Sequence, residues 1–570
     1  MASGASEKGG LVIITRDENG VSDIASQRMR SLGYDTVILE IPGCRKKTAT
    51  SKKSVGAPIY RIAEAGEASI GELFKKLTGE QGARPLAGFL HISSIPVNDG
   101  REDFDPEEQD ALKTVFLCAK NFVNHSEPDG RRRFFVSAVR MDGRLGLGTG
   151  RGQGSGAADR PDGGAADTPV DAVAAAHMQG GLLGLHKALN VEWDGEIFSK
   201  AVDVCRDIPP EKAAEYLLEE VFEPGCEYAE VGRAADGKRR FLELTEEYPE
   251  IPEHPGAAPG PEDVFLVTGG GRGITAACAI KLAEKSKGRF ILLGRTDASG
   301  DVGWTERRRD RSSLQKLALA KLAKDAASKP RPAEVNALVN AAINQMEVED
   351  TLKAIRNVGG SAKYFRCDVT DEKAFIKTVA EAEAEFGRVT GIVHGAGNIA
   401  DKKIQRKTAA DFDNVFGTKI RGLRACLKSV DTKKLKYLVL FSSIAACFGN
   451  AGQSDYAMAN EVMNKFAFEF KRRQRSCKVI SVNWGLWEAG GMASDSIKSA
   501  MQGTDARMIP VEVGTRYFME QFEYTQEPGV CQIVVNCGER LIRPDFGLAG
   551  PTPTAEAASN LVLTVGGMDT

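Results

Sequence analysis

The stretch VFLVTGGGRGITAACAIKLAEKSKGRFILLGRT, residues 264–296, decides the fold of the second half of the chain. An apolar strand leads directly into a glycine-rich turn, and a helix follows at once. Glycines here remove the Cβ atoms that would hold a pyrophosphate away from the backbone, and the helix start adds free N–H groups. The pattern therefore predicts a dinucleotide site. Its expected contacts are Thr268, Gly269, Gly271, Arg272, Gly273 and Ile274.

Residues at later strand ends complete the predicted cofactor site. The second strand ends in Arg295, whose cationic fork suits a 2′-phosphate, and Arg272 could join it, which favours NADPH over NADH. The strand YFRCDV closes with Asp368 and Val369, and an aspartate there either binds the adenine edge or caps the chain. The strand GIVHGAG ends in small residues expected to pass beneath the cofactor: Gly395, Ala396 and Gly397.

Alternation of strands and helices occurs twice along the chain. From Leu11, apolar strand-like runs alternate with helical segments such as EQDALKTVFLCAKNF and GGLLGLHKALNVEW. Such alternation predicts an α/β fold with a doubly wound parallel sheet in each half. The first half lacks glycines after its first strand, and its later helix carries no tyrosine. We therefore expect two Rossmann-like subdomains, the first structural and cofactorless, the second catalytic.

Shifts in composition set the expected boundaries. The predicted units are a structural subdomain over 10–246, a linker over 247–262, a catalytic subdomain over 263–548 and a linker or tail over 549–570. Within the catalytic unit, the charged, alanine-rich run at about 297–359 is expected to be a helical insertion. The Gly-rich run 142–168 in the first unit is expected to form a mobile loop.

Composition excludes several classes of protein. The 570 residues carry a formal net charge of −3, which gives no electrostatic reason to expect a nucleic-acid partner. Eleven scattered cysteines without a CxxC pair favour reduced thiols and a cytoplasmic location. Six histidines form no metal-binding motif, so no metal site is predicted. No apolar run is long enough to predict a membrane span.

The stretch FSSIAACFGNAGQSDYAMAN, residues 441–460, carries the predicted reactive groups. Ser443 is expected at a strand end, and Tyr456 is expected to open the next helix. Their hydroxyl groups could then reach one carbonyl oxygen. Asn460 follows four residues after Tyr456 and shares its helical face. This spacing indicates carbonyl chemistry more than packing.

These motifs together resemble the short-chain dehydrogenase/reductase superfamily. Most of its members have a lysine four residues after the tyrosine, whereas here Asn460 holds that position and Lys419 appears earlier, in VFGTKIRG. That exchange, with SVNWGLW, is similar to the ketoreductase domains of polyketide and fatty-acid megasynthases. The insertion and the stretch MIPVEVGTRYF resemble ketoreductases of polyunsaturated fatty acid synthases in particular. The first half resembles the structural subdomain of these ketoreductases.

The resemblance implies an NADPH-dependent reduction of a 3-ketoacyl thioester. The substrate would arrive on the phosphopantetheine arm of an acyl carrier protein, among neighbouring synthase domains. Ser443 and Tyr456 would hydrogen-bond the carbonyl oxygen, and Tyr456 would supply the proton. Lys419 would favour the phenolate and bond the nicotinamide ribose, and Asn460 would hold a water or the lysine in a relay.

Three departures from the family pattern stand out. Thr275 replaces the last glycine of the fingerprint, so the helix is expected to sit slightly away from the strand. In modular ketoreductases, a Leu-Asp-Asp motif marks one hydroxyl configuration and a tryptophan before the tyrosine marks the other. Here only Asp401 matches the first mark, and Phe448 replaces the tryptophan. The resemblance to fatty-acid synthases favours the 3R alcohol. The Gly-rich run of the first half is long for this family.

Two other functions remain open from the sequence. A non-catalytic scaffold that docks neighbouring synthase domains would need neither the glycine turn nor the Ser–Tyr pair. A free-standing reductase of small ketones, or an epimerising relative, would not need a large cofactorless first half.

Overall fold

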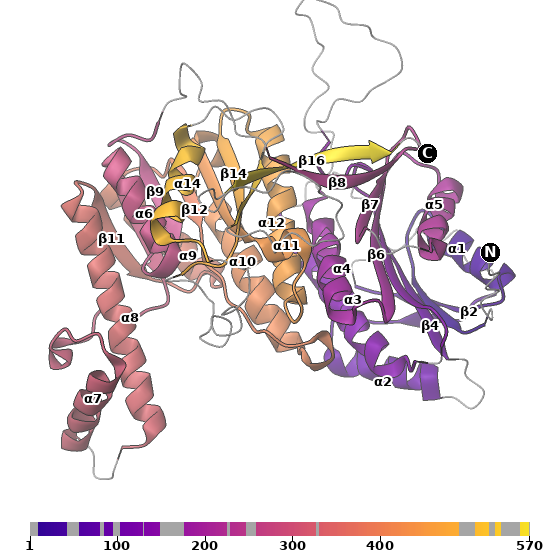
Figure 1. The fold of residues 1–570 in the computed structure, drawn as a ribbon, viewed down its shortest axis with the longest axis horizontal. Helices are drawn as coiled ribbons and strands as arrows, with labels where there is room; N and C mark the ends of the chain where they lie inside the picture. The colour runs from indigo at the N-terminus through magenta and orange to yellow at the C-terminus, as the bar shows by residue number, and fades with distance from the viewer. Residues whose placement is uncertain are drawn as a thin grey trace, which may run out of the picture.

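The computed structural model describes residues 9–42, 56–79, 85–94, 103–128, 130–148, 176–224, 228–246, 258–325, 330–488, 508–523, 531–536 and 559–568. They form two α/β lobes side by side, and a helical hairpin projects from the second lobe (Figure 1). No helix in these ranges is long and apolar enough to cross a membrane. The 149–168 part of the Gly-rich run and most of the predicted linker lie outside the described residues.

The first lobe alternates strands and helices from its first residues. Its elements are β1 (Leu11–Thr15), α1 (Val21–Ser31), β2 (Asp35–Glu40), β3 (Ile59–Arg61), α2 (Glu67–Gly79), β4 (Leu86–Ile92), α3 (Pro106–His125), β5 (Arg133–Val139), α4 (Gly180–Trp193), β6 (Ile197–Val204), α5 (Pro210–Phe222), β7 (Glu230–Arg233) and β8 (Arg239–Glu246). Strands β4, β5 and β6 are buried along their whole length. Strands that are buried along their whole length belong to a sheet covered on both faces.

The second lobe repeats the alternation and adds the hairpin. Its elements are β9 (Val264–Thr268), α6 (Gly273–Ser286), β10 (Arg289–Gly294), α7 (Arg311–Asp325), α8 (Pro332–Asn357), β11 (Ser361–Arg366), α9 (Glu372–Phe386), β12 (Gly391–His394), α10 (Ala409–Ser429), β13 (Tyr437–Ser443), α11 (Ile444–Phe448), α12 (Ser454–Arg473), β14 (Lys478–Trp484), α14 (Val511–Glu523), β15 (Gln532–Asn536) and β16 (Ser559–Met568).

The described strands form one 16-stranded sheet in which each lobe repeats the same order. The second lobe runs β11-β10-β9-β12-β13-β14-β15 and the first runs β3-β2-β1-β4-β5-β6-β7, all in parallel pairs. Each order reverses direction at its first strand, as in doubly wound folds. The prediction of two Rossmann-like parallel sheets is therefore confirmed.

Strands β8 and β16 join the two parallel halves of the sheet. β16 pairs antiparallel with both β15 and β8, and β8 pairs antiparallel with β7. Residues 549–570 were expected to be a linker or tail, yet Ser559–Met568 form this connecting strand. The sequence pattern missed it because PTPTAEAAS directly precedes the strand and dominates the composition.

Helices α4 and α12 form the seam between the lobes (Figure 1). A Cβ on Gly184 would lie 2.4 Å from the Ala457 carbonyl oxygen, so only a glycine allows the two backbones to approach this closely. A buried ion pair crosses the same seam, because the Lys187 amine lies 3.3 Å from Glu461, which also lies 2.9 Å from Lys465 of its own helix. The first lobe therefore fixes the position of α12 by packing and by a buried ion pair.

The predicted insertion contains α7 and α8, which pack against each other in a hairpin with a small apolar core of its own. Helix α8 does not stop at the hairpin. Its C-terminal half, including Val348 and Ile355, is buried against the body of the second lobe, next to α6. The insertion is therefore continuous with the helix that precedes β11.

Candidate active site

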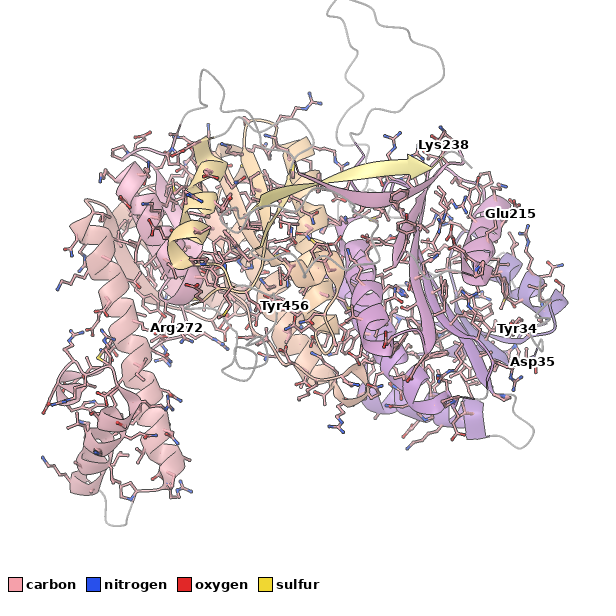
Figure 2. All side chains as sticks on the ribbon, in the orientation of Figure 1. Tyr34, Asp35, Glu215, Lys238, Arg272 and Tyr456 are labelled. Carbon is pink, nitrogen blue, oxygen red and sulfur yellow. The ribbon has the colours of Figure 1, made fainter. Side chains whose placement is uncertain are left out.

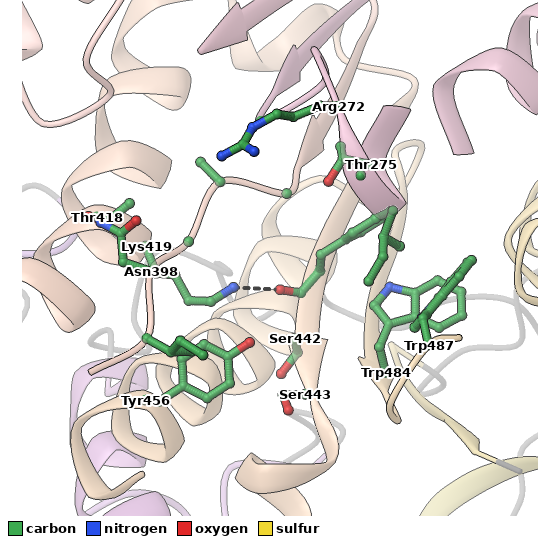
Figure 3. A pocket seen from close by; sticks show the side chains of 18 of the residues that line it. Arg272, Thr275, Asn398, Thr418, Lys419, Ser442, Ser443, Tyr456, Trp484 and Trp487 are labelled. Carbon is green, nitrogen blue, oxygen red and sulfur yellow. Dashed lines mark hydrogen bonds between the residues drawn. The ribbon is translucent and has the colours of Figure 1, made fainter. Parts of the chain in front are cut away.

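A cavity of about 1290 Å³ opens at the carboxyl ends of the second lobe's strands. Ligands of doubly wound folds bind at this edge of the sheet, where the strand order reverses. The cavity wall includes all the predicted site residues except Thr268 and Asn460, which lie buried behind it. Figure 3 shows the cavity with Lys419, Tyr456, Ser442 and Ser443 on one side and Arg272 at the far end.

The glycine turn between β9 and α6 forms one end of the cavity. Gly269 has a φ of 72°, and a Cβ there would lie 3.0 Å from the Ala396 backbone nitrogen. Helix α6 begins after Arg272 with no side-chain hydrogen bond at its cap. Its first N–H groups and the positive end of its dipole therefore face the cavity without a protein anion, which suits a pyrophosphate.

Thr275 packs directly over Gly395. A Cβ on Gly395 would lie 2.2 Å from the Thr275 hydroxyl oxygen, so the larger residue on the helix is matched by a missing side chain on the strand end. The departure from the glycine fingerprint therefore leaves no gap between α6 and the loop after β12.

A buried chain of hydrogen bonds links the glycine turn to Lys419. His394 Nε2 lies 2.9 Å from the Lys419 carbonyl oxygen, and Nδ1 lies 2.8 Å from the Thr268 hydroxyl. Burial lowers the pKa of His394 to about 3, so the ring is neutral. Because a carbonyl only accepts, Nε2 donates and Nδ1 accepts from Thr268, whose oxygen in turn accepts from Ala396 N–H at 3.3 Å. Sequence reasoning quoted HGAG but assigned His394 no role.

The two arginines lie at the far end of the cavity with partners that the sequence did not indicate. Arg295 donates to Asn398 at 2.9 Å, from the loop after β12. Arg272 donates to Asn344 at 2.8 Å and lies 3.8 Å from a Glu347 carboxylate oxygen. Both partners of Arg272 belong to α8 and line the cavity, so Arg272 lies beside the insertion helix (Figure 2). No local motif reveals that α8 reaches this site.

Helix α8 also supports the glycine turn from behind. The Thr351 hydroxyl donates to the Gly271 carbonyl at 3.0 Å, and a Cβ on Gly271 would lie 3.1 Å from Val348. The insertion helix thus forms part of the predicted dinucleotide site.

Asp368 and Val369 line the cavity just after β11. The Asp368 carboxylate accepts hydrogen bonds from Thr370, from the backbone N–H at 2.9 Å and from the hydroxyl at 2.7 Å. These bonds hold a local turn, whereas the cap of the following helix α9 is Asp371 and not Asp368. A second carboxylate oxygen and the backbone of Val369 remain beside the cavity, so the adenine contact stays a prediction.

The predicted reactive groups come together at the other end of the cavity. Ser443 is the last residue of β13, and Tyr456 lies in the first turn of α12, as the sequence predicted. The Tyr456 hydroxyl points toward the strand that carries Ser443 (Figure 3). Lys419 comes from α10, and its Nζ lies 5.5 Å from the centre of the Tyr456 ring. Lys419, Ser443 and Tyr456, which are separated in sequence, thus lie together at one corner of the cavity.

Burial governs the protonation of this corner. The Lys419 amine donates to the Phe441 carbonyl at 2.8 Å, and burial lowers its pKa to about 7. Burial likewise raises the pKa of Tyr456 to about 12, and the side chains of Asn460 and Ser443 offset this only in part. The role of Lys419 in favouring the phenolate stays a prediction, and in the free protein burial favours the neutral phenol.

Asn460 is buried behind Tyr456, one turn along α12. Its amide nitrogen donates to the Tyr456 carbonyl at 2.8 Å, and its Oδ1 has no hydrogen-bond partner. A buried acceptor without a partner is costly, so this oxygen is suited to accept from a water or from the Lys419 amine. Ser442, next to the strand end, donates to the Asn460 carbonyl at 3.3 Å and so fixes the helix against β13.

The geometry fits a dinucleotide and offers no metal site. The uncapped start of α6 and the close glycine turn are suited to a bound cofactor. Within the described ranges, no group of three or more His, Cys, Asp or Glu side chains could hold a metal ion.

Comparison with known proteins identifies the part of the chain that carries these groups. Residues 264–489 match the family described as the KR domain. These residues form a KR domain. Such domains are ketoreductases of the short-chain dehydrogenase/reductase type, which use nicotinamide cofactors. The glycine turn, Lys419, Ser443, Tyr456 and Asn460 all lie within the KR domain.

Similar proteins are large synthases. The chain is 37% identical over 404 residues to a polyunsaturated fatty acid synthase subunit of Thraustochytrium sp., and this match covers 70% of this chain and 14% of that protein. It is 35% identical over 166 residues to polyketide synthase PksL of Bacillus subtilis, covering 28% of this chain and 4% of that protein. The chain thus spans a small part of the length of either relative.

Solved ketoreductases share the fold of both lobes. An N-terminal ketoreductase from the macrolactin assembly line superposes with a TM-score of 0.63 at 17% identity, covering 94% of this chain and 88% of that one. A-type ketoreductases from a modular polyketide synthase give a TM-score of 0.61 at 18% identity, covering 93% and 89%. The lobe that precedes the KR domain is therefore also part of the shared architecture.

Proposed function

We propose that the chain is an NADPH-dependent 3-oxoacyl-[acyl-carrier-protein] reductase, converting a 3-ketoacyl thioester to the 3-hydroxyacyl thioester. The observation that carries the proposal is the shared corner of Lys419, Ser443 and Tyr456 at a cavity whose other end is a glycine turn. These groups are suited to a carbonyl oxygen on one side and a dinucleotide on the other.

The cofactor would be held along the length of the cavity. Its pyrophosphate suits the Gly269–Gly273 turn and the start of α6, and a 2′-phosphate suits Arg272 and Arg295. Gly395, Ala396 and Gly397 would pass beneath it, and Asp368 and Val369 would border its adenine. The bound nicotinamide supplies the hydride. An arginine in place of an acidic residue after the end of β10 supports NADPH over NADH.

The protein's own groups would stabilise charge and deliver the proton. Ser443 and Tyr456 donate to the ketone oxygen, and their hydrogen bonds strengthen as negative charge develops there. Tyr456, protonated in the free protein, then gives up its proton. The Lys419 amine, with a pKa of about 7, can pass a replacement proton near neutral pH, and Asn460 would hold the amine or a bridging water.

Two loops at the mouth of the cavity bear on the configuration of the product. Asp401 accepts hydrogen bonds from the Gln453 amide at 3.2 and 3.1 Å, so the aspartate that matches the family mark is tied to the loop before Tyr456. We propose the 3R alcohol on this basis.

The substrate would be delivered by a partner. A phosphopantetheine-linked acyl chain on a carrier protein fits the multidomain synthases to which the chain is similar, with neighbouring synthase domains as further partners. The described cysteines are free thiols, which supports a cytoplasmic setting.

A steady-state assay tests the proposal. The wild-type chain should oxidise NADPH when a 3-ketoacyl N-acetylcysteamine thioester is added, and Tyr456→Phe should lower kcat by at least ~10²-fold, the usual share of a general acid. NADPH affinity, followed by fluorescence titration, should stay within about twofold. A scaffold would show no turnover, a reductase of small ketones would prefer those ketones to the thioester, and an unchanged rate in Tyr456→Phe would remove the mechanism.

A further inference from the structure

A carboxylate from the first lobe joins two loops of the KR domain. Glu192 lies in the last turn of α4. Its Oε1 accepts a hydrogen bond from the backbone N–H of Ile404 at 2.5 Å, and its Oε2 accepts one from the N–H of Gly452 at 2.9 Å. One ionised side chain therefore satisfies two loop donors at once, with charge-assisted bonds. These two bonds are called the Glu192 clamp below.

Both clamped loops border the cavity. The loop after β12 places Ile399 in its wall, and the loop between α11 and α12 places Asn450 and Gln453 there. The loops also bind each other directly, because Lys402 N–H donates to the Gly452 carbonyl at 3.1 Å. The Glu192 clamp thus fixes a connected pair of loops to the first lobe.

The clamped loops reach the reactive tyrosine. Ile399 and Ala400 pack against the small apolar cluster that contains Tyr456. The Lys407 amine donates to the Ala400 carbonyl at 2.8 Å and forms a buried ion pair with Asp455, the residue before Tyr456. A shift of the loop after β12 would therefore change the wall that faces the phenol.

Close packing leaves these loops little freedom while the clamp holds. A Cβ on Gly449 would lie 2.2 Å from the Lys187 carbonyl, so the loop before α12 rests directly on the backbone of α4. Gly452, with a φ of 79°, turns its N–H toward Glu192. The last turn of α4 is thus in position to set where both loops lie.

We propose that Glu192 is a positioning residue that sets the shape of the substrate entrance, and through it which face of the keto group meets the cofactor. The inference rests on the proposed reduction of a 3-ketoacyl thioester. It gives the cofactorless lobe a part in substrate selection beyond its support of α12.

Glu192→Gln tests the clamp with little change in side-chain size. The amide keeps one acceptor and presents an N–H₂ donor to the other backbone N–H, so one loop is released. With a 3-ketoacyl N-acetylcysteamine thioester we expect KM to rise about tenfold, kcat to change less than about threefold, and the minor hydroxyl epimer to increase. The Kd for NADPH should not change. Glu196→Gln, the same substitution on an exposed side chain just beyond the helix, is the matched control and should leave all three unchanged.

Hydrogen exchange gives a readout that does not depend on turnover. Peptides covering 400–408 and 449–456 should exchange faster in Glu192→Gln than in the wild type and in Glu196→Gln. Unchanged exchange, KM and product ratio would overturn the inference, and so would an NADPH Kd that rises in step with KM, since that would mean general loosening. If the wild type reduces no 3-ketoacyl thioester, the proposed function fails, while the exchange data still decide whether Glu192 holds the two loops.

Discussion

The two lobes place the same residues at the same strand ends and then diverge. In the second lobe, Thr268 pairs with His394 at 2.8 Å; in the first, Thr15 pairs with His91 at 3.0 Å. Burial lowers the pKa of both histidines to about 3. Even the next backbone bonds agree, because the residue after each threonine donates to the neighbouring strand at 2.8 Å. The lobes share a detailed framework as well as a strand order.

The difference lies at the start of the helix that follows the first strand. In the first lobe, the Asp17 carboxylate accepts from the backbone N–H groups of Asn19, Val21 and Ser22 at 2.9, 3.2 and 2.8 Å. In the second lobe, the start of α6 has no such side chain. An internal carboxylate therefore occupies in the first lobe the position that a phosphate would take in the second. One aspartate thus satisfies the helix start that, in the second lobe, is expected to bind the cofactor's phosphates.

The corresponding later helices diverge as well. α12 presents Tyr456 to the cavity, whereas α4 presents Gly184 to the backbone of α12. The first lobe therefore uses this helix for packing.

Substituting Gly184→Val would break the seam and should have the largest effect. The new side chain meets the Ala457 carbonyl, a backbone atom that cannot rotate away. We expect a loss of about 3 kcal/mol or more in unfolding free energy, and loss of activity as α12 is displaced. Thermal unfolding and the NADPH assay measure both. Gly79→Ala, at a glycine where an added Cβ would meet nothing within 4 Å, is the control. Equal stability of the two variants would contradict the close packing of α4 against α12.

Removing the hydroxyl of Thr15 or of Thr268 distinguishes an effect on the framework that both lobes share from an effect on the expected cofactor site. Thr15→Val and Thr268→Val both leave a buried neutral histidine without a hydrogen-bond partner, so each should cost about 1–3 kcal/mol in denaturant unfolding. Only Thr268→Val should weaken NADPH binding, because its oxygen also holds the Ala396 N–H beneath the expected cofactor. An equal loss of NADPH affinity in both variants would mean that the first lobe's pair acts on the site.

Asp17→Ala tests whether the carboxylate at the start of α1 takes the place of a phosphate, and its expected effect on stability is smaller. Loss of the carboxylate should lower stability by about 1–2 kcal/mol, because three backbone donors and a helix dipole lose their anion. Phosphate buffer should restore part of the melting temperature relative to chloride at equal ionic strength. NADPH should still bind at one site per chain. If phosphate stabilises the variant no more than the wild type, the carboxylate is not a phosphate substitute.

Local patterns predicted the parts of the site that are continuous in sequence. The strand–turn–helix at Gly269, the positions of Ser443 and Tyr456, and the α/β order all follow from short-range spacing. Lys419 came from the resemblance, and the structure places it beside Tyr456. Contacts between distant segments left no such signal. Nothing in EVNALVNAAINQ shows that Asn344 meets Arg272, and nothing in ALNVEW shows that Glu192 binds loops more than two hundred residues away.

Burial was the second property that could not be predicted from the sequence. The sequence placed an amine near a phenol, but it could not show that burial of Tyr456 raises the pKa of the phenol to about 12. Residue types give the sign of an interaction, while the surroundings decide which of two opposing effects is larger.

Helix α8 has a mechanical consequence. Its 26 residues, at about 1.5 Å per residue, form a single rod of about 39 Å that runs from the tip of the projecting hairpin to the turn at Gly271. A straight helix has no hinge to absorb displacement along its length. A force on the tip of the hairpin would therefore be transmitted along α8 to the turn at Gly271. The groups at this turn are expected to bind the nucleotide's phosphates.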